Sequence, residues 1–395
     1  MSAITAKASR KMKKYAVLTR EPRSFLGSFD FSWEQRKLGD VVQITMGQSP
    51  DGSTYSDEPS DYILVQGNAD LQNGWVCPRI WTTQITKKAD AGDLIMSVRA
   101  PAGAMGKTAY NAVIGRGVAA IKGNEFIYQL LVKMDTDGFW KTLSCGSTFE
   151  SLNSDNIKNA EVKIPTTAEQ IKIGGFFQYL DNLITLHQRK LDKLKSVKKS
   201  MLEKMIPQNG EVKPEIRFTG FTDDWEQRKL SEVAERYDNL RIPVSANLRI
   251  PGSTPYYGAN GIQDYVEGYT HEGEFILVAE DGANDLKNYP VKCVKGRIWV
   301  NNHAHVLQGK NEIADNRFLA FAISQADIES LLVGGGRAKL NAETLMGLDL
   351  LLPVKQEQVL IGNYFANLDH LITLHQRKLE KLQNIKKAML EKMFV

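Results

Sequence analysis

A duplicated sequence pattern is the feature that most constrains the fold of this 395-residue chain. The residues from Trp33 to Leu38 read WEQRKL, and the same letters return from Trp225 to Leu230. A longer block, LDNLITLHQRKL from Leu180 to Leu191, returns as LDHLITLHQRKL from Leu368 to Leu379 with one difference. The spacings, 225 − 33 = 192 and 368 − 180 = 188, indicate two tandem units of about 190 residues each, longer than any small solenoid repeat.

Between the shared blocks the two copies diverge almost completely, over Val41 to Lys163 and Ala234 to Leu351. Short β-rich runs alternate there with clusters of Gly, Asn, Asp and Pro, a pattern typical of a twisted sheet with many loops. The expected strands include Tyr62 to Val65, Leu94 to Val98, Val118 to Ile121, Phe275 to Ala279 and Ile298 to Val300, and the expected helices are Gln129 to Leu143 and Asp315 to Leu332.

The longer repeated block predicts a coiled-coil helix in each unit, because a mostly apolar stripe advances by four and three residues in turn. The stripe residues are Leu180, Ile184, His187, Leu191 and Leu194 in the first copy, and Leu368, Ile372, His375, Leu379 and Leu382 in the second. A stripe of 26 residues, Leu180 to Met205, gives a rod of about 39 Å. Two nearly identical seams are natural partners, and antiparallel packing closes a pseudo-two-fold arrangement within one chain. His187, His375, Lys198 and Lys386 interrupt the stripe, and we interpret them as register-setting residues without chemistry.

These patterns predict an α+β fold: two globular mixed α/β domains, separated and joined by two long antiparallel coiled-coil helices. The expected segments are a basic arm at 1–24, a first domain at 25–165, a central helix at 166–206, a linker with the second domain at 207–353, and a C-terminal helix at 354–395. The arm has no acidic residue before Glu21. A disordered basic arm and an organellar transit peptide both have that composition, and we favour the former.

Composition excludes several classes of protein. The chain has 50 basic and 46 acidic residues, a net charge of +4, so bulk charge alone does not indicate nucleic-acid binding. Three widely spaced cysteines build neither a disulfide framework nor a four-cysteine zinc site. No apolar run approaches the roughly 18–20 residues of a membrane span. We therefore expect a cytoplasmic protein without membrane contact.

Two motifs resemble sites of chemistry. The stretch from Pro101 to Thr108 ends in Gly-Lys-Thr, but a P-loop requires glycine where this chain has Pro101. His303 and His305 share a face of a predicted strand, yet the neighbouring sequence holds no third ligand at metal-site spacing. We find no motif of a hydrolase, metalloprotease, dinucleotide-binding protein or adenine methyltransferase. The chain is therefore expected to be non-catalytic, with no bound cofactor and no metal.

Polar loops remain as candidate binding elements. Arg, Lys and Asn contact base edges in DNA, and Ser and Thr bond phosphates. The candidate DNA-binding residues are Arg99, Lys107, Arg116, Ser147 and Thr148 in the first insert and Asn302, His303, Arg337 and Lys339 in the second.

Two variable inserts, framed by duplicated WEQRKL and LDxLITLHQRKL blocks, closely resemble the specificity (S) subunit of type I restriction-modification enzymes. The resemblance extends from about Phe25 to Val395. It implies that each insert is a target recognition domain reading one half of a bipartite, asymmetric site in double-stranded DNA, and that the helices set the spacing between the halves. It also implies two methyltransferase (M) subunits docked on the repeated helices and two restriction/translocase (R) subunits. Those partners would supply the S-adenosylmethionine, ATP and Mg²⁺ chemistry.

A different class of function stays open at this stage. A coiled-coil adaptor, whose inserts bind protein partners, would share the repeat and the helices. Salt-dependent binding to a mixed pool of DNA duplexes distinguishes the two, because only the DNA-binding protein would show it. A free-standing enzyme has no motif to support it.

Overall fold

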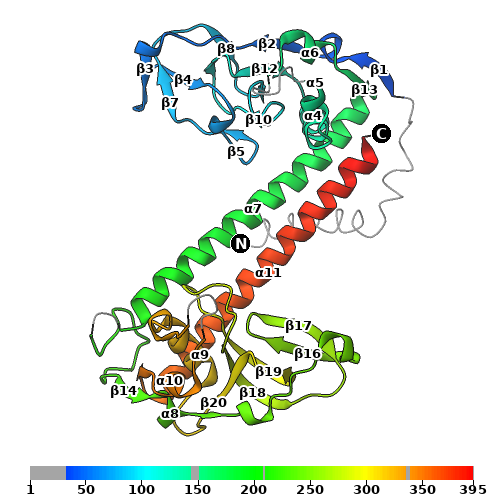
Figure 1. The fold of residues 1–395 in the computed structure, drawn as a ribbon. Coiled ribbons are helices and arrows are strands. Elements are labelled where there is room, and N and C mark those ends of the chain that lie inside the picture. Colours follow the sequence, from blue (N-terminus) through cyan, green and yellow to red (C-terminus); the bar gives the residue numbers. More distant parts are fainter. Residues whose placement is uncertain (1–32, 144–150, 208–209, 335–338, 395) are drawn as a thin grey trace, which may run out of the picture. The chain divides into compact units, whose positions relative to one another are not determined.

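The computed structural model describes residues 33–143, 151–207, 210–334 and 339–394, and we treat the chain as two compact units. The first comprises residues 1–186 and 379–395, and the second residues 187–378. Each unit contains one mixed α/β domain and parts of both long helices (Figure 1). Among the described residues, every helix is too short or too polar to cross a membrane.

The first domain contains three sheets. The six-stranded sheet has the order β2 (Gln43–Met46), β12 (Val118–Lys122), β9 (Leu94–Ser97), β10 (Met105–Lys107), β6 (Trp75–Val76), β5 (Leu71–Gln72). The five-stranded sheet has the order β3 (Tyr55–Ser56), β7 (Ile80–Thr82), β4 (Tyr62–Val65), β11 (Ala112–Ile114), β8 (Lys87–Ala89). A third sheet pairs β1 (Glu34–Lys37) with β13 (Glu161–Ile164). The helices and 3-10 turns of this domain are α3 (Leu38–Val41), α4 (Glu125–Thr136), α5 (Phe139–Leu143), α6 (Ser154–Lys158), η1 (Gly52–Thr54) and η2 (Asn68–Asp70).

The second domain repeats the six-stranded sheet although its sequence has diverged. The order is β15 (Ala234–Arg236), β20 (Ala304–Gly309), β18 (His271–Ala279), β19 (Val291–Val300), β16 (Pro251–Gly258), β17 (Gly261–Val266), with each neighbour parallel or antiparallel as in the first domain. The pair β14 (Glu226–Lys229) and β21 (Asp349–Leu352) repeats β1 and β13. The remaining short elements are α8 (Leu230–Val233), α9 (Asn316–Gln325), α10 (Ala342–Met346), η3 (Asp238–Leu240), η4 (Ala246–Leu248) and η5 (Glu329–Leu331).

Both expected helices near the ends of the inserts differ from the prediction in their bounds. The first is two helices, because Gly138 adopts a φ of +76° between α4 and α5. It also begins at Glu125 instead of Gln129, since the Asn124 side chain accepts a hydrogen bond from the Ile127 N–H and caps the helix there. The second helix ends at Gln325 and is followed by η5.

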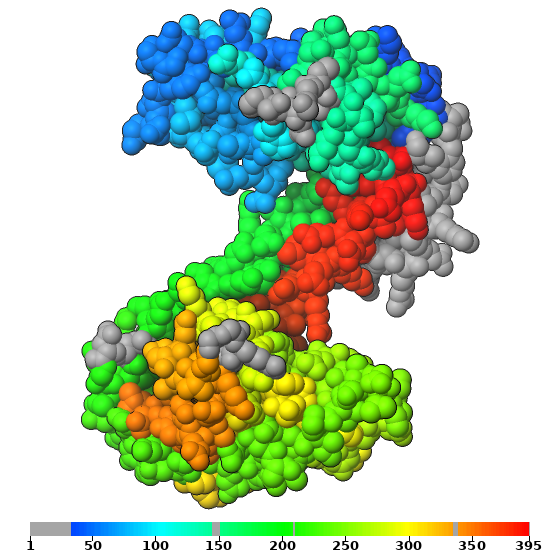
Figure 2. Space-filling view, viewed as in Figure 1, coloured from blue at the N-terminus to red at the C-terminus, as the bar shows by residue number. Residues whose placement is uncertain are grey.

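The duplicated tryptophan packs against a helix of its own domain, α4 in the first and α9 in the second. Trp33 packs edge-on against Phe126 at 5.5 Å, and Trp225 packs likewise against Phe318 at 5.7 Å. In the first unit Phe394, near the end of the chain, stacks on Phe126 at 5.1 Å. Figure 2 shows the red C-terminal turns of the chain in direct contact with the teal helical part of that unit. The tryptophan of the repeated WEQRKL block therefore makes an equivalent aromatic contact in both domains.

The long helices are α7 (Thr167–Met205) and α11 (Lys355–Met393). In the first unit Lys386 of α11 pairs with Asp181 of α7 at 2.6 Å, and in the second unit Lys198 of α7 pairs with Asp369 of α11 at 2.6 Å. A second contact in each unit gives the direction of the helices. Phe177 lies beside Phe394 in the first unit, and His187 bonds His375 in the second, so the partner residue number falls as the residue number on α7 rises. The expected antiparallel packing is thus confirmed within each unit, and all ten seam residues named above are buried or half-buried.

Candidate nucleic-acid interface

Two arginines lie opposite each other at one end of the six-stranded sheet of the first domain. Strands β9 and β12 are antiparallel, with Ser97 opposite Val118. The ladder continues past the strand ends, because the Val98 N–H donates to the Gly117 carbonyl at 2.9 Å. One further step of the same register places Arg99 opposite Arg116, and both are exposed.

The second domain places a different pair at the corresponding position. Strands β18 and β20 are antiparallel, with Ala279 opposite Ala304. The Glu280 N–H donates to the His303 carbonyl at 2.9 Å, which continues the ladder. The next step places Asp281 opposite Asn302. Asp281 and Asn302 are therefore the counterparts of Arg99 and Arg116.

A third segment adjoins this position in both domains. Arg99 forms an isolated bridge with Ser151, and Asp281 forms one with Lys339. The Leu152 N–H donates to Val98 at 2.9 Å, and the Leu340 N–H donates to Glu280 at 2.7 Å. The predicted DNA-binding residues Ser147, Thr148 and Arg337 lie outside the described residues. Arg99 and Arg116 come together in one domain, and Asn302, His303 and Lys339 in the other.

Glycines allow the two larger sheets of the first domain to meet in backbone contact beneath Arg116. A Cβ on Gly117 would lie 2.0 Å from the Gln66 carbonyl oxygen, and one on Gly47 would lie 2.1 Å from the Gly115 carbonyl oxygen. No side chain fits at either position. The Arg116 N–H also donates to the Ser49 hydroxyl at 3.2 Å. The loop that carries Arg116 is therefore fixed by its neighbours.

Lys107 lies at the other end of this sheet. It pairs with Leu94, the first residue of β9. Its ammonium group bonds the Glu125 carboxylate at 2.9 Å and lies 4.4 Å from the centre of the Tyr128 ring. The Lys107 side chain is only 13% exposed. The Gly-Lys-Thr stretch is thus part of a strand with its lysine bound internally. The ion pair of Lys107 with Glu125 therefore joins β10 to α4.

A buried ion network lies beneath the corresponding end of the second domain. His305 Nδ1 bonds Asp238 at 2.7 Å and its Nε2 bonds the Leu340 carbonyl at 2.9 Å. Glu280 accepts from Arg241 at 2.6 Å and from Lys339 at 3.0 Å. The network ties the segment of Lys339 to β18 and β20.

The same network sets two pKa values. Burial alone would raise the pKa of Asp238, but hydrogen bonds from His305 and the Val306 N–H outweigh it and hold that pKa below its ordinary value. Burial would also raise the pKa of Glu280. Hydrogen bonds from Arg241 and Lys339 outweigh this effect of burial and lower that pKa. Both carboxylates are therefore ionised at neutral pH.

Asp238, Glu280 and His305 also form a group whose ligand atoms lie within 4.8 Å of one another. Sequence spacing missed it because Asp238 and Glu280 are distant in the chain and no local pattern marks them. Arg241 and Lys339 already neutralise these carboxylates, and both ring nitrogens of His305 are bonded. The donor set fits a closed ion network better than a metal centre.

The family assignment follows from the duplicated frame and its two inserts. The profile of the family described as "Type I restriction modification DNA specificity domain" matches residues 32–196 and 222–384, more than half of the chain. The chain belongs to this specificity family. Its two copies match separately, as the repeat predicts.

Several proteins resemble this specificity-family chain. A Haemophilus influenzae protein named as a type I restriction enzyme specificity subunit is 48% identical over 128 residues, 32% of this chain and 33% of that protein. The MjaIX specificity subunit of Methanocaldococcus jannaschii is 22% identical over 349 residues, 75% of this chain and 77% of that one. The crystal structure of a type I restriction-modification S subunit from M. genitalium aligns with a TM-score of 0.74 and 14% identity, covering 93% of this chain and 98% of that one, a likeness of fold.

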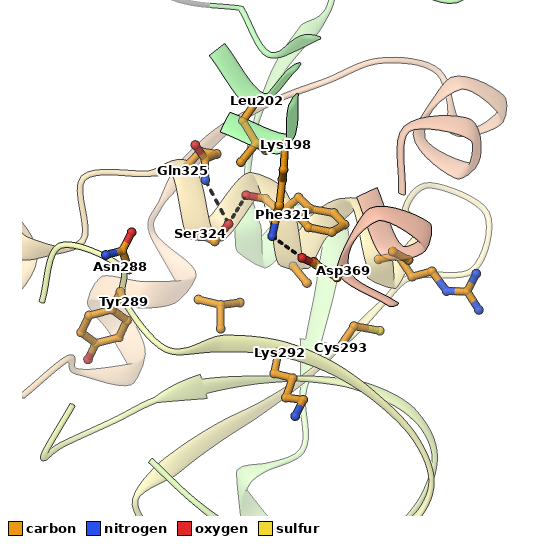
Figure 3. Close-up of a pocket in the computed structure, with 14 residues that line it drawn as sticks. Lys198, Leu202, Asn288, Tyr289, Lys292, Cys293, Phe321, Ser324, Gln325 and Asp369 are labelled. Carbon is orange, nitrogen blue, oxygen red and sulfur yellow. Dashed lines mark hydrogen bonds and ion pairs between the residues drawn. The ribbon is translucent and has the colours of Figure 1, made fainter. Parts of the chain in front are cut away.

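The second unit of the specificity-family chain contains a cavity of about 460 Å³ (Figure 3). The Lys198 ammonium and the Asp369 carboxylate point toward one another there, beside the Phe321 ring. Burial first, and then the charge of Glu274, raise the pKa of the Cys293 thiol to about 12. A protonated thiol is a poor nucleophile. The cavity therefore has an internally paired lysine and an unreactive cysteine, which do not favour catalysis.

Apolar side chains also remain exposed on the long helices of the specificity-family chain. Leu186 of α7 is 47% exposed in the first unit, and Leu374 of α11 is 38% exposed in the second. They occupy the same position of the repeat, since 374 − 186 = 188. The two copies of the repeat therefore leave the same leucine exposed on each long helix.

Proposed function

We propose that this chain is the DNA-binding specificity subunit of a type I restriction-modification complex, in which each domain reads one half of a bipartite site. The observation that carries the proposal is the pair of equivalent sheet ends. One framework presents Arg99, Arg116 and Ser151 in the first domain, and Asp281, Asn302 and Lys339 in the second. Base edges in the major groove differ in their donors and acceptors, so different side chains at one position select different bases. A nearly symmetric frame thereby reads an asymmetric target.

The long helices are proposed to set the spacing of the half-sites and to dock two methyltransferase subunits. Leu186 and Leu374 support this, because repeat-equivalent surfaces offer the same contacts to two copies of one partner. Two restriction/translocase subunits would complete the complex. We further propose that the partners bring S-adenosylmethionine, ATP and Mg²⁺, and that a target adenine is flipped into a methyltransferase pocket. In this proposal the chain itself supplies sequence recognition.

The proposal is tested by expressing the chain with its methyltransferase subunits and sequencing the methylome of the cells. We expect methylation at one bipartite sequence with two different halves. The purified complex should also bind a mixed duplex pool with an affinity that falls steeply as salt rises, because phosphate contacts release counterions. Binding only to protein, with no salt-dependent DNA affinity, would support an adaptor instead.

A further inference from the structure

Arg99 and Arg116 differ from most of the basic residues around them. Neither guanidinium has an ion-pair or hydrogen-bond partner among the described residues, and both residues are exposed. Several other cations of this domain are paired with carboxylates: Arg36 with Glu34, Arg79 with Asp70, Lys107 with Glu125, Lys122 with Asp90, and Lys133 with Asp137. Two adjacent arginines whose donors are unused by any described residue indicate that they bind a ligand.

The backbone beneath them is held in place. The Val98 N–H bonds Gly117, and the Leu152 N–H bonds the Val98 carbonyl, so three segments converge at this point. Gly117 lies against the Gln66 carbonyl with no room for a side chain. Arginines on a fixed backbone lose less conformational freedom on binding than arginines on a free loop, which favours specific readout over loose charge attraction.

We propose that Arg99 and Arg116 read guanine in the half-site bound by the first domain. A guanidinium presents a planar fork of N–H donors, and the O6 and N7 acceptors of guanine in the major groove match that fork. The ligand is therefore a guanine edge in duplex DNA, and the inference rests on the proposed function.

The second domain limits the inference to one half of the target. Asp281 and Asn302 occupy the corresponding positions, and the Asp281 carboxylate is hydrogen-bonded to the His303 ring. A carboxylate is an acceptor and repels the O6 and N7 acceptors of guanine. Guanine readout by an arginine pair is thus expected in the first half alone.

The experiment uses the complete methyltransferase complex and compares Arg99→Lys and Arg116→Lys with the unchanged chain. Lysine keeps the charge but lacks the planar fork. We expect each variant to accept other bases at one guanine position of one half-site, with discrimination reduced on the order of 10- to 100-fold. The other half-site should be unchanged in the methylome.

Arg36→Lys is the matched control, because Arg36 is also exposed and belongs to the same domain but lies on β1. It should leave the target unchanged. Thermal unfolding of each variant confirms that it folds. The inference is overturned if the first half-site contains no guanine, or if folded Arg99→Lys and Arg116→Lys complexes keep the original target. Absence of any bipartite methylated sequence with the unchanged chain would overturn the proposed function itself.

Discussion

His187 and His375 meet across the long helices at equivalent positions of the repeat. Their Nδ1 atoms are 2.7 Å apart, so one ring must donate and the other must accept, and at least one imidazole is neutral. Burial, then the charge of the other histidine and of Lys378 and Lys190, lower the pKa of His187. Burial and the same two lysines lower the pKa of His375. The sequence marked both as seam residues, but only the structure shows that they bond each other.

This pair predicts a pH-dependent stability. Unfolded histidine titrates near pH 6.5. Below that pH the unfolded chain binds more protons than the folded one, so the free energy of unfolding should fall as the pH drops from about 7.5 to about 5.5. Denaturation curves across this range measure the effect. The double variant with His187→Leu and His375→Leu should show a shallower fall, and equal slopes in both proteins would contradict the prediction.

At the scale of elements, adjacent glycines of α7 have different environments. Gly174 lies against the start of α4, where an added Cβ would lie 2.8 Å from the Phe126 backbone nitrogen. Gly362 of α11 makes the equivalent approach to α9, with a Cβ 2.9 Å from the Phe318 nitrogen. The repeated Ile-Gly pair, Ile173-Gly174 and Ile361-Gly362, therefore marks the position in each unit where two helices cross closely. Gly175, one residue on, faces open space.

We predict opposite effects for the two alanine substitutions in α7. Gly174→Ala should destabilise the chain by about 1–3 kcal/mol, because the helix must move away from α4. Gly175→Ala should stabilise it by about 0.5–1 kcal/mol, because alanine favours the helix and meets nothing. Thermal or denaturant unfolding of both variants measures the difference. If Gly174→Ala is as stable as Gly175→Ala, the crossing is not tight in solution.

At the scale of the whole molecule, the two ends of each variable insert are joined to the repeated segments at neighbouring positions. The Leu38 N–H donates to the Ala160 carbonyl at 2.9 Å, and in the second copy the Leu230 N–H donates to the Leu348 carbonyl at 2.9 Å. The ends of each insert are thus side by side in its own unit. An insert can diverge without changing the position of the frame residues around it, which accounts for two variable regions between constant blocks.

This arrangement predicts the result of an insert exchange. Replacing residues 40–160 by the insert of another family member should change one half of the methylated sequence and leave the other half and the spacer unchanged. Methylome sequencing of cells carrying the chimera and its methyltransferase subunits measures both halves. The prediction fails if both halves change or if neither does, provided that the chimera is folded and active.

The sequence by itself determined the duplication, the two long helices with their seam and the family, because repeats and helical periodicity are local patterns along the chain. Only the tertiary structure showed that both inserts share one sheet order, that Arg99 lies opposite Arg116, and that Asp238 and Glu280 join His305. It also showed that Lys107 is bound to Glu125. Strand register and ion pairing join residues far apart in the chain, and an alternating strand pattern does not specify which partner each strand takes.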